Sequence, residues 1–142
     1  MTRLAGPGRI EYDDDVSGLR PEDLEGFFVD WPVPPSPERR LAILHGSDRV
    51  LLAREPRSGR VVGFVTAVTD GVLSAYIPLL EVVPDHQGAG IGTELMRRLL
   101  EEFRDLYIVD LVCDPQLESF YRRFGMVPLT GMALRNRAAL TE

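Results

Sequence analysis

A glycine-rich turn in the middle of the chain has the residue types and spacing to bind a phosphate group. It runs Gln87-Gly88-Ala89-Gly90-Ile91-Gly92 and is followed by Thr93. Glycines at alternate positions let the backbone approach a ligand closely. The helix that we expect to begin here adds amide groups without intrahelical partners, and such helix starts bind anions. The turn therefore predicts an anion site, above all for a pyrophosphate, although a purely structural turn would give the same pattern.

Two other phosphate-binding turns do not fit this context. A dinucleotide-binding turn has the spacing G-x-G-x-x-G, whereas the glycines here are spaced G-x-G-x-G. Asp110 does lie 20 residues after Gly90, but only 29 residues follow Cys113, which is too few for that fold. A P-loop requires a lysine, and all 16 basic residues of the chain are arginines. The absence of lysine also excludes Schiff-base chemistry.

Glu81 is a second candidate for chemistry, because it interrupts a nearly continuous apolar run from Ser74 to Val83. A charge in such a run needs a partner or a function. Alternation along a strand places Glu81 on the face opposite Leu80 and Val82, unless a bulge changes its direction. We expect Glu81 to be either a catalytic or substrate-binding carboxylate or one half of a salt bridge to an arginine.

The apolar periodicity predicts a mixed α/β sheet with flanking helices that positions these residues. We expect about six to seven strands, at 9–12, 49–54, 60–69, 74–83, 106–113 and two short ones within 126–135. Helices are expected from Pro21 to about residue 30, from Pro37 after the cap residue Ser36, over 90–103 and over 115–124. Pro78 cannot donate a ladder hydrogen bond, so the strand 74–83 should contain a bulge or an unpaired stretch.

Composition narrows the class of protein. With 142 residues and 44% hydrophobic residues, we expect one domain spanning 1–142. No apolar run reaches the roughly 18 residues of a membrane span, so we expect a cytoplasmic protein. The single cysteine, Cys113, excludes a disulfide framework and a CxxC metal or redox site. The net charge of −6 argues against a nucleic-acid partner and suits a cationic ligand.

The turn and its surroundings resemble motif A of the GNAT (Gcn5-related) N-acetyltransferases, which reads V-x-P-x-x-R/Q-G-x-G-x-G/A before an amphipathic helix. The matching residues are Val82, Pro84, Gln87, Gly88, Gly90 and Gly92. Downstream, the run Phe120-Tyr121-Arg122-Arg123-Phe124-Gly125-Met126 resembles the family's second hallmark, an aromatic residue and a tyrosine that close a short helix. The resemblance extends from about residue 49 to 135, and two motifs at this separation are more specific than either alone.

The resemblance implies the GNAT acyl-CoA N-acyltransferase fold, in which two neighbouring parallel strands, here 74–83 and 106–113, splay apart around the pantetheine arm of acetyl-CoA. It implies that the amides of Val82 and Val83 bind this arm and that the turn binds the pyrophosphate. Capping of the following helix is the interpretation that we prefer for Asp114. The acetyl-CoA-binding residues so implied are Val82, Val83, Gln87, Gly88, Ala89, Gly90, Ile91, Gly92, Thr93, Asp114 and Phe120.

By the same resemblance, Tyr121 is the proton donor to the sulfur of CoA, although packing beside Phe120 and Phe124 would also explain this residue. Some family members carry a catalytic glutamate earlier on the motif A strand, where Pro78 stands here, which leaves Glu81 as the candidate base. The implied activity is N-acetyl transfer from acetyl-CoA to a primary amine by direct attack. A non-catalytic acyl-CoA-binding sensor or interaction module is the alternative.

Acceptor recognition in folds of this kind usually involves the first two helices, here 21–45. Residues 1–30 hold eight acidic residues, Asp13 to Asp15 among them, against three arginines, which predicts attraction for a cationic amine. Dimerisation through the C-terminal strands is common in such folds, so a homodimer is a further expectation. We expect His86 to be a solvated loop residue.

Overall fold

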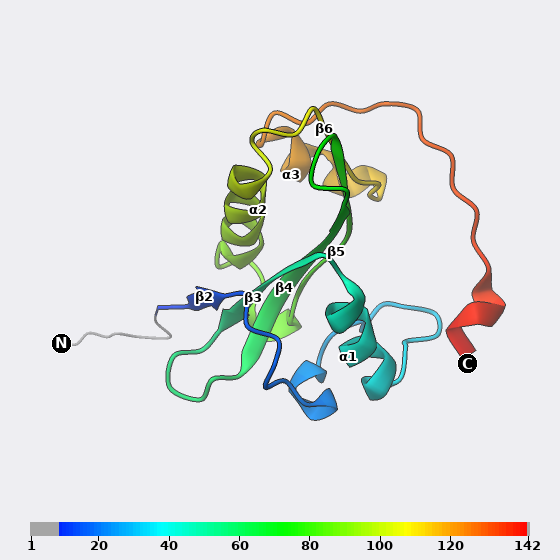
Figure 1. The fold of residues 1–142 in the computed structure, drawn as a ribbon. Coiled ribbons are helices and arrows are strands. Elements are labelled where there is room, and N and C mark those ends of the chain that lie inside the picture. Colours follow the sequence, from blue (N-terminus) through cyan, green and yellow to red (C-terminus); the bar gives the residue numbers. More distant parts are fainter. Residues whose placement is uncertain (1–8, 142) are drawn as a thin grey trace.

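A mixed five-stranded sheet forms the centre of the computed structural model, which describes residues 9–141 (Figure 1). The strands are β2 (Glu11–Asp13), β3 (Arg49–Arg54), β4 (Val61–Thr69), β5 (Ser74–Val82) and β6 (Ile108–Asp110), and they lie in this order across the sheet. All neighbours are antiparallel except β5 and β6, which are parallel. The predicted mixed sheet is confirmed, with fewer strands than expected.

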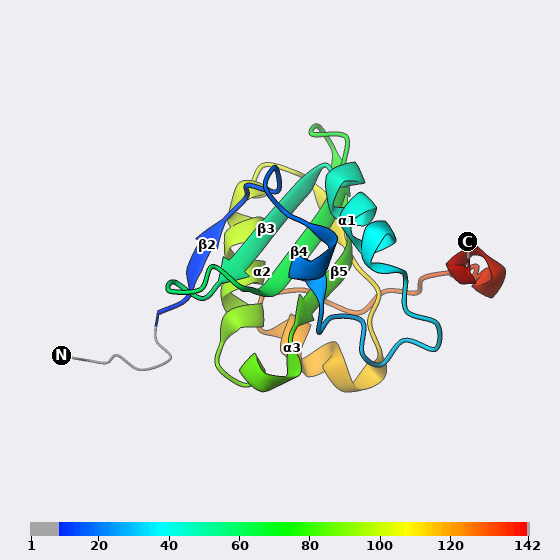
Figure 2. The same cartoon turned by 90° about the horizontal axis from the view of Figure 1, so that it is seen from below.

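Helices cover both faces of this sheet. They are α1 (Pro37–Gly46), α2 (Ile91–Glu102) and α3 (Glu118–Arg122), and the 3-10 turns are η1 (Pro21–Leu24), η2 (Pro84–His86), η3 (Pro115–Leu117) and η4 (Arg137–Thr141). A Cβ atom on Gly63 of β4 would meet Ile91 and Leu95, so α2 packs closely against this face. The next residue, Phe64, contacts Phe27 on the opposite face, where η1 and α1 lie (Figure 2). No helix in the described part of the chain is long and apolar enough to cross a membrane.

The two predicted N-terminal helices have different outcomes. The second, α1, begins at Pro37 as predicted, and the Ser36 hydroxyl accepts a hydrogen bond from the Arg39 amide at 3.2 Å. The first is wrong, since only the turn η1 forms. Gly26 and Phe28 have φ angles of 90° and 63°, which end any right-handed helix. The residues that follow η1 form a loop instead, and Phe28 anchors it with a ring that is only 2% exposed.

The strand β5 contains the predicted bulge at Pro78. Thr66 pairs with Leu79 and Val68 with Tyr76, so one residue of β4 faces two residues of β5. On its other edge, β5 pairs with β6 only from Ser74 to Tyr76. Beyond Tyr76 the two parallel strands are no longer paired, as the predicted splay requires. The strand β6 is shorter than predicted because residues 111–113 have left the sheet.

The two strands predicted within 126–135 are wrong. These residues follow α3 as an extended arm that runs past β6 and away to η4 (Figure 1). Gly131 approaches Val112, whose Cγ1 lies 3.7 Å from the position of a Gly131 Cβ, but no ladder forms there. A strand requires hydrogen bonds from a neighbouring backbone. The arm has the residue pattern of a strand without such a neighbour.

Candidate active site

The glycine-rich turn connects the end of β5 to the start of α2. Gly88 and Gly90 have φ angles of 81° and 86°, a conformation that glycine adopts without strain. Gly90 is the N-cap of α2, so the amides of Ile91, Gly92 and Thr93 belong to the first turn and have no intrahelical acceptor. The positive end of the dipole of a 12-residue helix lies at the same point. The predicted turn is thus an exposed backbone site that suits an anion.

Contacts on both sides hold this turn in place. The side-chain amide of Gln87 donates to the backbone oxygen of Val82 at 3.0 Å. His86 lies 3.1 Å from carboxylate oxygens of both Glu55 and Asp85. Its side chain is only 15% exposed, so the expectation of a solvated loop residue is wrong. Glu55 belongs to the turn between β3 and β4, and nothing in the sequence spacing indicated this contact.

Only one of the two predicted pantetheine amides faces the gap beside β5. The Val83 amide donates to Val62 of β4 at 2.9 Å and is therefore not free. Hydrogen bonds along an antiparallel strand point alternately to either side, so the Val82 amide faces away from β4. By the same alternation the Leu80 amide faces the gap, and sequence analysis missed it. The prediction for Val83 overlooked that adjacent amides cannot share one side of a strand.

The aromatic motif of α3 lies against the start of α2. Phe120 packs beside Gly92, with its Cζ atom 3.7 Å from the position of a Gly92 Cβ. The Tyr121 ring stands edge-on to Phe120 at a centroid distance of 4.9 Å. Burial, with a smaller contribution from Cys113, raises the pKa of Tyr121 to about 12. Tyr121 thus keeps its proton at neutral pH, as a proton donor must.

Asp114 is exposed at the N-cap position of η3. Its backbone oxygen accepts a hydrogen bond from Leu117 at 2.9 Å, but its side chain makes no capping bond. The preferred interpretation of side-chain capping is therefore wrong. Along the chain, Asp114 lies between the end of β6 and the start of α3.

Glu81 lies on the face of β5 opposite α2, as predicted. Leu80 and Val82 reach within 3.9 Å of the position of a Gly92 Cβ, whereas Glu81 Oε1 accepts a hydrogen bond from the Phe28 amide at 3.0 Å. Burial raises the pKa of Glu81, and the hydrogen bonds from Phe28 and Trp31 lower it by less. Among residues 9–141 no arginine forms an ion pair with Glu81, which excludes the salt-bridge interpretation for that part of the chain.

The acidic N-terminal residues are mostly occupied by contacts within the protein. Asp13 pairs with Arg54 at 2.8 Å and Asp14 with Arg49 at 3.2 Å. Asp15 accepts hydrogen bonds from the amide and the hydroxyl of Ser17. These contacts occupy Asp13 to Asp15 within the protein, and the expectation that the acidic residues of 1–30 attract a cationic amine stays a prediction.

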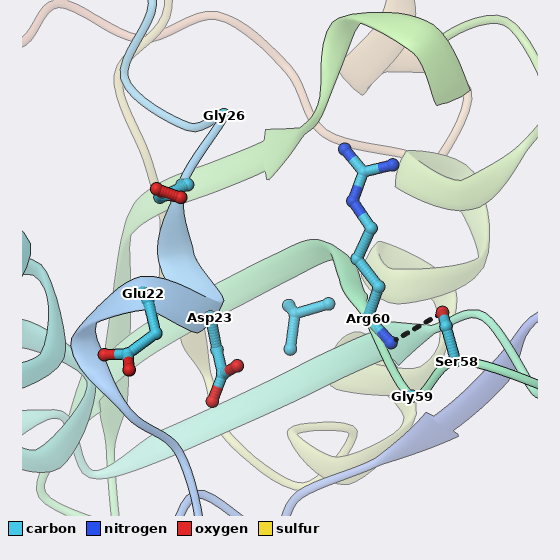
Figure 3. A pocket seen from close by; sticks show the side chains of 8 residues that line it. Glu22, Asp23, Gly26, Ser58, Gly59 and Arg60 are labelled. Atoms are coloured by element: carbon cyan, nitrogen blue, oxygen red, sulfur yellow. Dashed lines mark hydrogen bonds between the residues drawn. The ribbon is translucent and has the colours of Figure 1, made fainter.

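Three other carboxylates line a cavity of about 470 Å³ on the η1 side of the sheet. Figure 3 shows Glu22 and Asp23 on η1 and Arg60 on the other side of the cavity. Arg60 also pairs with Asp85 at 3.3 Å. The full lining is Glu22, Asp23, Glu25, Gly26, Ser58, Gly59, Arg60 and Val61.

Comparisons with known proteins agree with this geometry. A curated N-acetyltransferase of uncharacterised role from Porphyra purpurea is 32% identical over 70% of this chain and 59% of its own. A GCN5-related N-acetyltransferase of Arabidopsis thaliana, named as chloroplastic, is 31% identical over 79% of this chain and 58% of its own. The chain thus spans a little under three fifths of the length of these relatives.

Solved structures are similar over nearly the whole chain. A protein from Deinococcus radiodurans R1, described as an acetyltransferase, has a TM-score of 0.88 and 44% identity over 97% of this chain and 95% of its own. A GNAT family acetyltransferase of Streptococcus pneumoniae has a TM-score of 0.69 and 29% identity over 91% and 98%. The family model of the acetyltransferase (GNAT) family matches residues 16–126. The chain belongs to the GNAT family.

Proposed function

We propose that this chain transfers the acetyl group of acetyl-CoA to a primary amine. The observation that carries the proposal is a path with two parts: the edge of β5 that is unpaired beyond Tyr76 among the described residues, toward which the amides of Leu80 and Val82 point, and the glycine turn at the start of α2. Such a path suits a ligand with an amide-containing arm at one end and phosphates at the other. Tyr121 adds a proton donor beside it. The names of the relatives support nitrogen as the acceptor atom, and one in rice is named a serotonin N-acetyltransferase.

Residues of the turn, of β5 and of the α3 region would each contact a different part of acetyl-CoA. The amides of Gly88 to Thr93 would bind the pyrophosphate, with Gln87 holding the turn on Val82. The amide of Val82 would bind the pantetheine arm. Phe120 would form the wall between the two regions, since it packs on Gly92. Asp114, at the N-cap of η3, makes no side-chain capping bond, and its carboxylate would face the same arm.

Catalysis requires one group that accepts a proton and one that donates it. When bound, acetyl-CoA supplies an activated acetyl thioester. Glu81 accepts the proton that the amine loses, directly or through water, as the new carbon–nitrogen bond forms. Leu80 donates its free amide to the developing oxyanion. Tyr121 gives its hydroxyl proton to the sulfur as the carbon–sulfur bond breaks. The proton taken by Glu81 then returns to solvent, and the phenolate of Tyr121 takes a proton back from solvent.

We also propose that the acceptor carries a positive charge, and that the cavity between η1 and the β3–β4 turn receives it. Three carboxylates line this cavity. Glu22 and Asp23 share Arg20 at 3.7 and 3.3 Å, and Arg60, the arginine among the lining residues, pairs with Asp85. Gly26 lies between the cavity and the site. It lines the cavity and packs against Val83, and it precedes by two residues Phe28, whose amide donates to Glu81. Replacing Glu22 and Glu25 by glutamine should raise KM for a diamine and leave KM for a neutral monoamine unchanged. Equal effects on both amines would contradict this part of the proposal.

We further propose that the chain forms a homodimer through its C-terminal arm. Four large apolar side chains of this arm are 67 to 95% exposed, namely Val127, Leu129, Met132 and Leu134. A group of exposed apolar side chains in one segment marks an interaction surface. The edge of β6 that does not pair with β5 offers unpaired backbone to an arm from a second copy. Light scattering should give twice the chain mass, and replacing Met132 and Leu134 by aspartate should halve it. A monomeric wild-type protein at tens of micromolar would refute the dimer.

The experiment that tests the function measures release of free thiol from acetyl-CoA across a library of primary amines. Turnover with at least one amine supports the enzyme, and mass spectrometry of the product identifies the acetylated nitrogen. CoA binding without thiol release from any amine would support the alternative, a non-catalytic acyl-CoA sensor. A cytoplasmic location is also a proposal, because two relatives are named chloroplastic, and cell fractionation tests it.

A further inference from the structure

We propose that Arg123 is the cation of the donor-phosphate site and contacts a phosphate group of acetyl-CoA beside the start of α2. Neither the glycine motif nor the aromatic motif assigns a role to this residue. The inference rests on the proposed function, because it names one more residue of the same donor site.

Contacts from two directions fix the guanidinium of Arg123. Its Nη2 atom donates to the hydroxyl of Thr93 at 3.1 Å, and Thr93 is the third residue of α2. Its guanidinium carbon lies 4.8 Å from the ring centroid of Phe120 and 6.0 Å from that of Phe124. Phe120 in turn packs on Gly92. A side chain at the C-cap of α3 thus brings its charge to the first turn of α2, where the amides without intrahelical acceptors lie.

The charge of Arg123 is not neutralised within the described residues. Arg60 pairs with Asp85, Arg97 and Arg98 with Glu94, and the neighbouring Arg122 with Glu118. No carboxylate in the described range 9–141 lies within ion-pair distance of Arg123. Stacking on an aromatic ring orients a guanidinium and leaves its charge available. Within residues 9–141, Arg123 is therefore a preoriented cation without an acidic partner.

The donor site needs such a cation. Acetyl-CoA carries several negative charges on its pyrophosphate and ribose phosphate, and the chain has a net charge of −6. Motif A accepts arginine or glutamine before its first glycine, and this chain has the neutral Gln87, whose side chain donates to Val82. The glycine turn supplies amides and the helix dipole only. Since arginine binds phosphate through parallel hydrogen bonds, Arg123 supplies the charge that the turn lacks.

A purely structural role for Arg123, as a link between α3 and α2, makes a different prediction. Loss of that link would disturb Phe120 and Gly92, and with them the binding of every part of the donor. Loss of a phosphate contact would weaken only ligands that carry phosphate. The comparison of CoA with pantetheine, which has the same thiol arm and no phosphate, separates the two roles.

The test uses the full chain and the variants Arg123→Ala, Arg123→Lys and Arg122→Ala. Arg122 is the matched control, because it is adjacent and pairs with Glu118 on the surface. Calorimetry should give a 10- to 100-fold higher Kd of CoA for Arg123→Ala, which is roughly the loss expected when one charge-assisted hydrogen bond is removed. The increase in Kd should be smaller for Arg123→Lys. Arg122→Ala should bind as the wild type does. Pantetheine binding, followed by ligand-observed NMR, should change less than threefold in all variants.

Two outcomes would overturn the inference and leave the proposed function standing. One is that Arg123→Ala binds CoA as tightly as Arg122→Ala. The other is that Arg123→Ala loses CoA and pantetheine to the same extent, which would assign Arg123 a structural role. Failure of the wild-type chain to bind CoA at all would instead overturn the proposed function, and the inference with it.

Discussion

Replacing Glu81 tests the weakest step of the proposed chemistry, because this carboxylate can act as a base, as an anchor for the loop after η1, or as both. Its Oε1 atom accepts the Phe28 amide at 3.0 Å. Phe28 has a φ angle of 63°, so the loop holds a strained conformation that this bond supports. Glutamine keeps an acceptor oxygen at the same place but cannot take a proton. Alanine removes both functions.

The two variants therefore separate the two roles. If Glu81 is the base, Glu81→Gln should lower kcat by about 100- to 10,000-fold, the usual range for a general base, with a change in the unfolding free energy below about 1 kcal/mol. Glu81→Ala should lose kcat to the same extent. It should also lose about 1–3 kcal/mol of stability, because the buried Phe28 amide is left unpaired. Steady-state kinetics and urea denaturation measure both quantities on the same preparations.

The pH dependence of the rate tests the role of Glu81 as a base independently. Burial raises the pKa of Glu81 above 4.5, so the wild-type rate should fall as the pH drops through a value higher than that of an ordinary glutamate. Glu81→Gln should lack this acidic limb. A Glu81→Gln variant that keeps its rate within threefold, together with the limb, would refute the base and leave Glu81 as an anchor.

The same shift affects stability in a defined direction. A carboxyl whose folded pKa is raised binds its proton more tightly in the folded state than in the unfolded state. Its stabilising contribution is complete below pH 4.5 and is lost as the pH rises through the folded value. Glu81→Gln has no such proton. The Tm of this variant minus the Tm of the wild type should therefore increase as the pH rises through this window. A Tm difference that does not change with pH would contradict the shift.

Two further predictions concern the donor side. Tyr121→Phe should bind CoA normally and lose about 100-fold or more in kcat. Tyr107→Phe is the control, since Tyr107 is 86% exposed, and it should match the wild type. Equal loss of kcat in both variants would contradict the role of Tyr121. Gly90→Ala should raise KM for acetyl-CoA and cost about 1–3 kcal/mol of stability, because φ is 86°. Since no atom of the described residues lies within 4 Å of the added Cβ, this cost is backbone strain and not a clash. Gly18→Ala, where the Cβ also meets nothing within 4 Å and φ is not positive, is its control and should cost less than about 1 kcal/mol.

The parts of the fold that sequence analysis predicted well depend on local patterns. Ser36 and Pro37 define the start of α1, and the apolar spacing defines α2, because capping and periodicity act within a few residues. The bulge at Pro78 follows from one missing donor. The glycine turn was predictable for the same reason, since its conformation is a property of its own backbone.

The failures share a dependence on partners distant in the chain. The strand pattern of 126–135 was identified, but a strand forms only beside another backbone, and among the described residues none lies in register with it. His86 was assigned to solvent because Glu55, 31 residues earlier, could not be placed beside it. Val83 was assigned to the gap because the side to which an amide points depends on the pairing of β4 with β5.

The two halves of the site are therefore specified in different ways. The proposed donor half consists of backbone amides at one strand end and one helix start, so a short motif determines it. The acceptor half joins residues 53 positions apart through a single carboxylate, since Glu81 holds the loop that carries Phe28. Changes in this loop can alter the surface offered to an amine while the turn at Gly88 to Gly92 keeps its geometry. If the proposed function holds, the motif accounts for the donor, and the residues that select the acceptor should be found in the contacts of the loop between η1 and α1.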